Sequence, residues 1–295
     1  MRVLIIGADG AIGKALGVGL ESRGHTVIGT TRRGALSASK ERIFLDLAAP
    51  SLPKLPQTDV AVICAAMSRF ADCRNAPDLA HRVNVTVPLK IAMDVKGHGG
   101  RVLLLSSSVV FDCLRPHVKG DAPTAPRTDY GRLKADAEAG VLGLGGSVLR
   151  LTKVVTPETG TLVDWILALR QGRSVRAFQD HRFCPISLHD VIDGMTRVIE
   201  QPEAGVFQLS GAEDISYADA ARHLADRLGV LSSRVEGSFA VESGIPGNEV
   251  TAFTSLDTSR LSALTGFVPP TPRAVIDRVY QAAFSRAHVP LESSL

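Results

Sequence analysis

A glycine-rich turn close to the N-terminus constrains the fold of this chain more than any other segment. The turn reads Gly7-Ala8-Asp9-Gly10-Ala11-Ile12-Gly13 and follows the apolar run Val3-Leu4-Ile5-Ile6. After it, apolar residues recur four positions apart at Ile12, Leu16 and Leu20. The unbroken apolar run predicts a strand buried on both faces, and the four-residue spacing predicts the apolar stripe of a helix. We therefore expect a strand, a tight turn and a helix in this order.

The three glycines have the spacing of a phosphate-binding loop. The first glycine allows the tight turn, the second lets a pyrophosphate approach the backbone, and the third lets the helix pack on the strand. The N–H groups and the dipole of the helix then face the phosphates. We expect a dinucleotide cofactor here, contacted by Gly7, Asp9, Gly10, Ala11, Ile12 and Gly13. A plain connection between strand and helix is the alternative, because glycine-rich turns are common.

Strand patterns alternate with helical patterns through the first half of the chain. Apolar runs return at residues 26–28, 42–45, 60–64, 102–105 and 148–151, and a helical pattern covers about residues 77–95 with an interruption at Pro88. This alternation predicts an α/β fold built on a doubly wound parallel sheet of the Rossmann type. Residues 1–155 are expected to form the cofactor domain.

The second half of the chain has a looser pattern. Helices are predicted at residues 161–171 and after Ser187 and Ser216, each of which begins an S-x-x-D capping sequence, with a strand at residues 206–209 between the last two. Residues 156–295 are expected to form mainly a smaller, interleaved α/β substrate domain. Part of residues 180–205 is expected to return to the cofactor domain.

Composition excludes several classes of function. The formal net charge is +3 and the basic residues are scattered, which argues against nucleic-acid binding. No apolar run is long enough to span a membrane, and the N-terminal run is too short for a signal peptide. The four cysteines show no C-x-x-C spacing, so reduced thiols in the cytoplasm are expected. No cluster of ligand-type residues suggests a metal site.

The end of the second strand pattern bears on the choice between NAD and NADP. An acidic residue there, about 20 residues after the glycine turn, would bind the ribose 2′-hydroxyl of NAD. This chain has Thr30-Thr31-Arg32-Arg33 instead, and two guanidinium groups suit a 2′-phosphate. NADP(H) is therefore favoured over NAD(H), with Thr31, Arg32 and Arg33 as contacts. Asp46, beside Leu47, could bind the adenine amino group or merely cap a turn.

A hydroxyl, a phenol and an ammonium form the candidate reaction site. Tyr130 and Lys134 are four residues apart, which places both on one helix face, and Thr128 suits the N-cap of that helix. Upstream, a strand pattern ends in Ser106-Ser107-Ser108. The carboxyl ends of the strands in an open α/β sheet face the ligand crevice. The three serines are therefore expected at the cofactor.

Taken together, these motifs resemble the extended branch of the short-chain dehydrogenase/reductase family, and within it the dTDP-4-dehydrorhamnose reductase group that acts on nucleotide sugars. Tyr130 follows Ser107 by 23 residues, and this spacing is part of the resemblance. Further segments are similar to this group: Ala65-Ala66, Val83-Asn84, Ser107 through Val110-Phe111-Asp112, and Arg150. The resemblance is good over residues 1–155 and continues weakly to about residue 285.

The resemblance implies a role for each residue of the candidate site. Tyr130 would be the general acid that protonates a substrate carbonyl, and Ser107 would orient that carbonyl. Ser106 and Ser108 are the alternatives for the role of Ser107. Lys134 would hold the nicotinamide ribose and favour the phenolate form of Tyr130. Asn84 would belong to a proton relay or only support the helix. Ala65 and Ala66 would line the cofactor site.

Departures from the group's motifs leave the substrate open. Ser108 and Val109 stand where nucleotide-sugar dehydratases have Asp-Glu, and Val109 stands where fucose-forming enzymes have a cysteine. Thr152-Lys153-Val154 replaces a segment in which rhamnose reductases have a tryptophan. Substrate contacts are expected from Ser108, and from His181 and Arg182 toward a diphosphate. A solvated loop at His181 and Arg182 is the alternative.

The leading hypothesis is NADP(H)-dependent reduction of a keto-sugar nucleotide or another small carbonyl substrate. A nucleotide-sugar 4-epimerase that retains its cofactor would use the same residues. A non-catalytic NADP-binding regulator is the third alternative, and the intact Ser107, Tyr130 and Lys134 argue against it. The sequence leaves open the identity of the sugar and whether the chain forms a homodimer.

Overall fold

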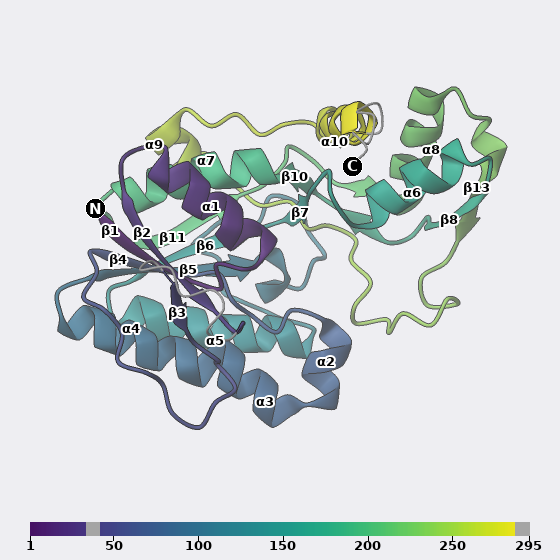
Figure 1. Ribbon diagram of the computed structural model, residues 1–295. Helices are drawn as coiled ribbons and strands as arrows, with labels where there is room; N and C mark the ends of the chain where they lie inside the picture. The colour runs from purple at the N-terminus through teal and green to yellow at the C-terminus, as the bar shows by residue number, and fades with distance from the viewer. Residues whose placement is uncertain (34–41, 287–295) are drawn as a thin grey trace.

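The computed structural model describes residues 1–33 and 42–286, and its centre is a seven-stranded parallel sheet (Figure 1). The strand order is β11-β6-β5-β4-β1-β2-β3, which is the doubly wound arrangement predicted from the sequence. The strands are β1 (Arg2–Ile6), β2 (Thr26–Thr31), β3 (Arg42–Phe44), β4 (Val60–Ile63), β5 (Arg101–Ser107), β6 (Ser147–Leu151) and β11 (Gly205–Leu209).

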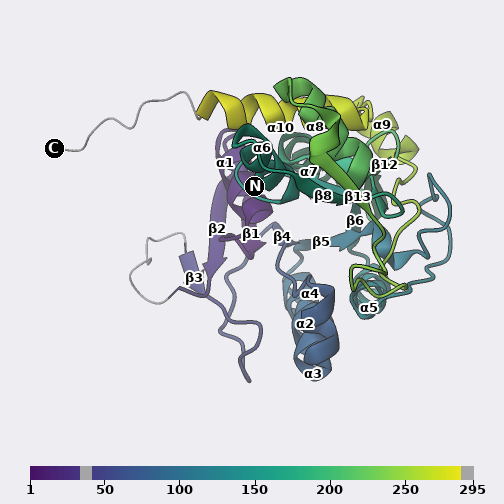
Figure 2. The same ribbon diagram turned by 90° about the vertical axis from the view of Figure 1, so that its right-hand side faces the viewer.

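Helices cover both faces of this sheet, in layers that Figure 2 shows on opposite sides of the strands. One layer contains α1 (Ala11–Glu21), α7 (Leu188–Glu200) and α9 (Ser259–Thr265), and the other contains α4 (Val87–Gly97) and α5 (Asp129–Gly143). In β1, Val3 and Ile5 face the first layer, whereas Leu4 and Ile6 face the second. Burial on both faces explains why the strand reads as an unbroken apolar run.

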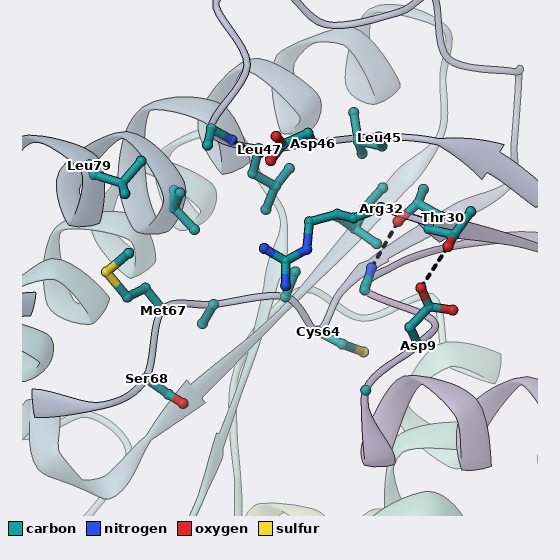
Figure 3. Close-up of a pocket in the computed structure, with 18 of the residues that line it drawn as sticks. Asp9, Thr30, Arg32, Leu45, Asp46, Leu47, Cys64, Met67, Ser68 and Leu79 are labelled. Carbon is teal, nitrogen blue, oxygen red and sulfur yellow. Dashed lines mark hydrogen bonds between the residues drawn. The ribbon is translucent and has the colours of Figure 1, made fainter. Parts of the chain in front are cut away.

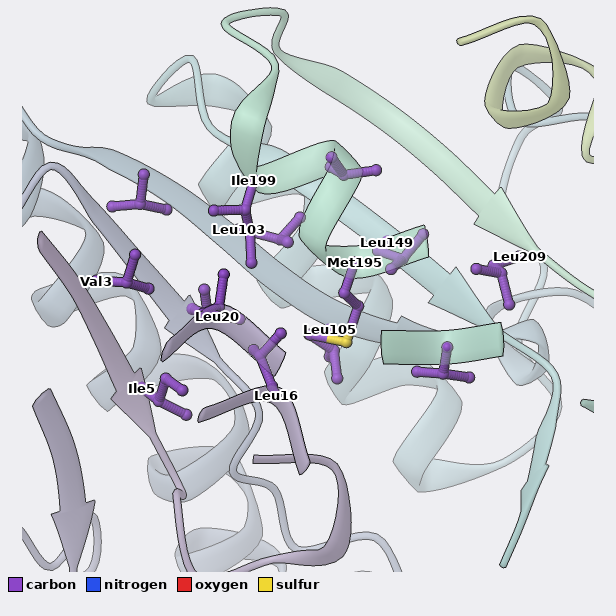
Figure 4. Close-up of a cluster of buried hydrophobic side chains, with 14 of the residues drawn as sticks. Val3, Ile5, Leu16, Leu20, Leu103, Leu105, Leu149, Met195, Ile199 and Leu209 are labelled. Atoms are coloured by element: carbon purple, nitrogen blue, oxygen red, sulfur yellow. The ribbon is translucent and has the colours of Figure 1, made fainter. Parts of the chain in front are cut away.

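Figure 4 shows the apolar contact between the sheet and the first layer. Leu16 and Leu20 of α1 pack beside Met195 and Ile199 of α7, and none of the four is more than 1% exposed. Helix α7, which comes from the second half of the chain, thus packs against the N-terminal sheet and α1.

The predicted helix at residues 77–95 is present, with an irregular turn directly before Pro88. Helix α3 (Pro77–His81) continues into a π-helical segment, Arg82–Thr86, and then into α4. Pro88 lies in the second position of α4, within a helical run that is unbroken from α3, so its missing N–H removes a bond to the carbonyl of the preceding turn. The π-helical segment is that preceding turn, and the predicted interruption at Pro88 is confirmed as a local irregularity that does not end the helix. A short helix, α2 (Phe70–Asn75), precedes α3.

A second apolar cluster joins α6 (Thr161–Arg170), α8 (Tyr217–Leu228) and α10 (Pro272–Arg286), with two-stranded sheets beside it. Those sheets pair β7 (Lys153–Val155) with β10 (Pro185–Ser187), β9 (Arg182–Phe183) with β12 (Ile215–Ser216), and β8 (Val175–Phe178) with β13 (Val235–Ser238). Ser187 and Ser216 cap α7 and α8 by accepting from the N–H groups of Asp190 and Asp219, as predicted. Among the described residues, no helix is long and apolar enough to cross a membrane.

Candidate functional site

Two glycines of the turn, Gly7 and Gly13, leave no room for a side chain. Gly7 has a φ of +90°, and a Cβ there would lie 2.8 Å from Cβ of Ala65. A Cβ on Gly13 would lie 2.3 Å from the carbonyl oxygen of Gly7, so only glycine lets α1 begin this close to the turn. Gly10 is the N-cap of α1 and no side chain caps the helix. The N–H groups at the start of α1 are thus left available to a ligand.

Side chains from β2 hold the turn in place (Figure 3). The hydroxyl of Thr30 accepts a hydrogen bond from the N–H of Gly7 at 2.9 Å, and the hydroxyl of Thr31 donates to Asp9 at 2.6 Å. Nη1 of Arg42 donates to the other oxygen of Asp9, also at 2.6 Å. These bonds, that of Thr31 above all, lower the pKa of Asp9 below its ordinary value. Arg42 was not anticipated, because its register beside β2 is a tertiary feature.

A pocket of about 970 Å³ opens over this turn, and we call it the glycine-turn pocket. Figure 3 shows Arg32 reaching into it, with Leu47 and Cys64 on its walls. Ten of the predicted cofactor contacts line it: Gly7, Asp9, Gly10, Thr31, Arg32, Arg33, Asp46, Leu47, Ala65 and Ala66. The carboxylate of Asp46 also accepts from the N–H of Ala48, which is the turn-capping alternative. Ala11 and Gly13 do not line the pocket.

A second pocket, of about 480 Å³, lies next to the first and shares Cys64, Ala66 and Ser68 with it. We call it the Ser107 pocket. The predicted residues that line it are Ile12, Ser106, Ser107, Ser108, Tyr130, Lys134, His181 and Arg182. The structure therefore brings the serines, the tyrosine and the lysine to one cavity that adjoins the glycine turn.

Helix α5 brings the phenol and the ammonium into this pocket. Thr128 caps the helix by accepting from the N–H of Gly131 at 3.1 Å, as the sequence predicted. A Cβ on Gly131 would lie 2.2 Å from the carbonyl oxygen of Val109, so this glycine lets α5 approach the serine turn. Lys134 is only 2% exposed, and the ring of Tyr130 packs beside that of Phe70.

The three serines lie at the carboxyl end of β5 and in the 3₁₀ turn that follows, Ser108–Val110. The hydroxyl of Ser107 accepts a hydrogen bond from the N–H of Val109 at 3.4 Å. Its own hydrogen is therefore free to donate to a ligand. The buried Oγ of Ser106 has no hydrogen-bond partner among the described residues.

Burial shifts the pKa values of both Tyr130 and Lys134. It raises the pKa of Tyr130, because loss of water destabilises the phenolate. The expected effect of Lys134 on the phenolate stays a prediction. Burial lowers the pKa of Lys134 to about 8, against the opposing effects of Glu138 and Cys64. The protein thus keeps the phenol of Tyr130 protonated and makes the ammonium group of Lys134 easier to deprotonate.

Asn84 holds the backbone of the segment that contains Met67. It is 1% exposed, and its side-chain amide accepts from the N–H of Met67 and donates to the carbonyl of Met67, both at 3.0 Å. Asn84 lines neither pocket, and Met67 belongs to the segment that lines the glycine-turn pocket. Its contacts agree with the structural alternative and show no direct approach to a cofactor.

His181 and Arg182 form part of the wall contributed by the second half of the chain. The ring of His181 stacks on Tyr217 at 5.1 Å, and its Nδ1 accepts from the N–H of Thr251. Nη2 of Arg182 donates to the carbonyl of Asp214. Both residues line the Ser107 pocket, so the solvated-loop alternative was wrong.

Sequence reasoning missed several residues of this wall, among them Lys153, Tyr217, Glu249 and Thr251. They come from segments that lie far apart in the chain, and no local motif predicts that these segments meet. The one signal available was Lys153, which stands in a segment that departs from the resembled group.

Comparison with known proteins gives one family match. The family described as RmlD substrate binding domain matches residues 1–284. The beta subunit of methionine adenosyltransferase 2 from Pongo abelii is 28% identical over 278 residues, which cover 89% of this chain and 82% of that protein. A dTDP-4-dehydrorhamnose reductase from Mycolicibacterium smegmatis is 23% identical over 242 residues, covering 79% and 71%.

Among solved structures, the fold is similar to that of dTDP-4-dehydrorhamnose reductase from Bacillus anthracis, which was solved in complex with NADP. The TM-score is 0.78 at 18% identity, and the match covers 95% of this chain and 98% of the other. This similarity supports the fold described above, the Rossmann-type sheet included.

Proposed function

Because this chain belongs to the RmlD substrate binding domain family, and with it to the NAD(P)-dependent oxidoreductases of the extended short-chain dehydrogenase/reductase type, we propose that it reduces a keto-sugar nucleotide with NADP(H). The observation that supports this most is the convergence of Ser107, Tyr130 and Lys134 on one pocket that adjoins the glycine turn.

The cofactor would be held by the glycine-turn pocket. The bare N-terminus of α1, and the glycines whose Cβ atoms would collide with backbone, suit a pyrophosphate. Arg32 and Arg33 line the same pocket and would hold a 2′-phosphate. The one carboxylate of the turn, Asp9, is already bonded to Thr31 and Arg42, which reduces its repulsion of that phosphate. When bound, the reduced nicotinamide supplies a hydride.

Side chains of the protein would orient the carbonyl oxygen of the substrate and give it a proton. Ser107 would donate its free hydroxyl hydrogen to the carbonyl oxygen and orient it. Tyr130, kept protonated by burial, would give its proton to that oxygen as the carbon is reduced, so that the carbonyl becomes a hydroxyl group. Lys134 would hold the nicotinamide ribose and stabilise the phenolate that remains.

A turnover screen tests this function. Keto-sugar nucleotides with thymidine and uridine diphosphate are offered with NADPH or NADH, and absorbance at 340 nm is followed. We expect NADPH to be consumed with at least one of them, and faster than NADH. Consumption of neither coenzyme by any keto sugar would contradict the proposal.

Two other functions use the same fold. A regulatory role is favoured by the 28% identity to a protein whose name is that of an enzyme's beta subunit. Such a regulator would bind NADP without turnover. A 4-epimerase would copurify with tightly bound cofactor and interconvert sugar nucleotides without net consumption of NADPH.

We place the protein in the cytoplasm, where its four cysteines, all free thiols, stay reduced.

A further inference from the structure

The Ser107 pocket contains a cation that neither the sequence motifs nor the proposed chemistry uses. Lys153 is the first residue of β7, and it lines the pocket together with Ser107 and Tyr130. In the sheet, Ser107 of β5 is paired with Leu151 of β6, two residues before Lys153. Lys153 itself begins a different strand, β7, which pairs with β10, and its exposed side chain lines the same cavity as Ser107 and Tyr130. A substrate held by those two residues would therefore share the cavity with this ammonium group.

Lys153 has no counter-ion among the described residues, since neither a hydrogen bond nor an ion pair engages its ammonium group there. The carboxylate that lines the same pocket, Glu249, forms an ion pair with Arg74 instead. Of the other cations in the pocket, Lys134 faces Glu138 and Cys64, and Arg182 donates to the carbonyl of Asp214. The positive charge at Lys153 is thus unbalanced.

His181 extends this positively charged wall. The ammonium of Lys153 is close enough to help burial lower the pKa of the imidazole. Because Nδ1 of His181 accepts from Thr251, the neutral ring has its proton on Nε2, where it can donate to a ligand. Partial loss of hydration in the cavity also lowers the pKa of Lys153, although the residue as a whole is exposed. An anion bound at this wall would relieve both effects.

We propose that Lys153 binds a carboxylate on the sugar ring of the substrate, beside the carbonyl that Ser107 and Tyr130 hold, so that the preferred substrate is an acidic sugar nucleotide. This inference rests on the proposed function for the identity of the reaction. The nucleotide diphosphate is the other anion of such a molecule. The sugar ring separates the diphosphate from the reacting carbonyl, whereas Lys153 lines the same cavity as the residues that would hold that carbonyl.

Binding measurements separate the two anions. The affinities of UDP-glucuronic acid and UDP-glucose are measured by calorimetry in the presence of NADP⁺, and the thymidine analogues are tested in the same way. Both sugars carry the same diphosphate, so their affinity ratio reports the carboxylate alone. We expect the wild-type protein to bind the glucuronic acid form about tenfold more tightly, as for one charge-assisted contact.

Variants assign the preference to one residue. Lys153→Gln should bring the affinity ratio close to one, and Lys153→Arg should retain it. Lys90→Gln, which removes an equal charge from an exposed position on α4 outside both pockets, should leave it unchanged. Thermal unfolding of each variant checks the fold. Equal weakening of both ligands by Lys153→Gln would assign Lys153 to the diphosphate and overturn the proposal, as would a wild-type protein without preference or without binding.

A turnover measurement distinguishes failure of the role of Lys153 from failure of the proposed function. Oxidation of each sugar nucleotide by NADP⁺, followed at 340 nm, reports turnover independently of binding. Turnover without carboxylate preference overturns the role of Lys153 and leaves the reductase in place. Carboxylate preference in binding, without turnover of any sugar, supports the role of Lys153 and contradicts the reductase.

Discussion

Arg150 and Glu138 form a buried ion pair that joins β6 to α5. Nη2 of Arg150 lies 2.7 Å from Oε2 of Glu138, and its Nε is 3.1 Å from both carboxylate oxygens. The two side chains are 4% and 3% exposed. Nη1 of Arg150 also donates to the carbonyl of Gly120. The pair therefore ties the helix that contains Tyr130 and Lys134 to the central sheet.

Removing one partner of this pair should destabilise the protein strongly. In Glu138→Ala the guanidinium of Arg150 stays buried without its counter-charge, which costs about 3–5 kcal/mol. The free energy of unfolding in urea measures the loss. Asp136→Ala, at an exposed position of the same helix, should change it by less than about 0.5 kcal/mol. Equal losses in the two variants would mean that the ion pair is not what stabilises this contact.

A methyl group at Gly13 should damage the cofactor site. In Gly13→Ala the new Cβ would lie 2.3 Å from the carbonyl oxygen of Gly7, so the turn must move. We expect the affinity for NADPH, measured by fluorescence titration, to fall at least tenfold. Gly17→Ala is the matched control, because a Cβ there has its nearest neighbours at 3.8 Å. Unchanged affinity in Gly13→Ala would show that the turn does not contact the cofactor.

Arg32 should distinguish NADPH from NADH. In Arg32→Gln one guanidinium is removed from the wall of the glycine-turn pocket. A lost charge-assisted contact to the 2′-phosphate should raise the dissociation constant for NADPH about 10- to 100-fold and leave that for NADH nearly unchanged. Parallel titrations with both coenzymes measure the ratio. A similar loss for both would assign Arg32 to a part of the cofactor that the two share.

Activity should fall at alkaline pH because of Lys134. The proposed mechanism requires a protonated lysine, and burial lowers the pKa of that lysine to about 8. The raised pKa of Tyr130 keeps the phenol protonated over the same range. We therefore expect kcat/KM for reduction to be constant below pH 7 and to fall above pH 8. In Lys134→Arg the charge persists, so any remaining activity should decline only at higher pH; an unchanged decline would mean that another group titrates.

The parts of the fold that could be predicted from the sequence are those encoded by local patterns. The apolar runs at β1 and β4, the glycine turn and the cap at Thr128 each depend on residues that are near one another in the chain. Residues at the carboxyl ends of neighbouring strands could also be predicted to meet, and Ser107 indeed lines a pocket that adjoins the glycine-turn pocket.

What could not be predicted depends on contacts between distant segments. Arg42 reaches Asp9 only because β3 pairs with β2, and Tyr217 reaches the Ser107 pocket only through the packing of the second half of the chain. The raised pKa of Tyr130 belongs to the same class, since it comes from burial, which no local motif reports.

The central claim is that Tyr130 is the general acid, and Tyr130→Phe tests it most directly. The variant keeps the ring that packs beside Phe70 and removes only the hydroxyl group. With the keto-sugar nucleotide found in the screen, kcat for NADPH oxidation should fall at least 1,000-fold, at the upper end of what one positioned acid contributes, with unchanged NADPH affinity. Turnover within tenfold of the wild-type rate would contradict this account.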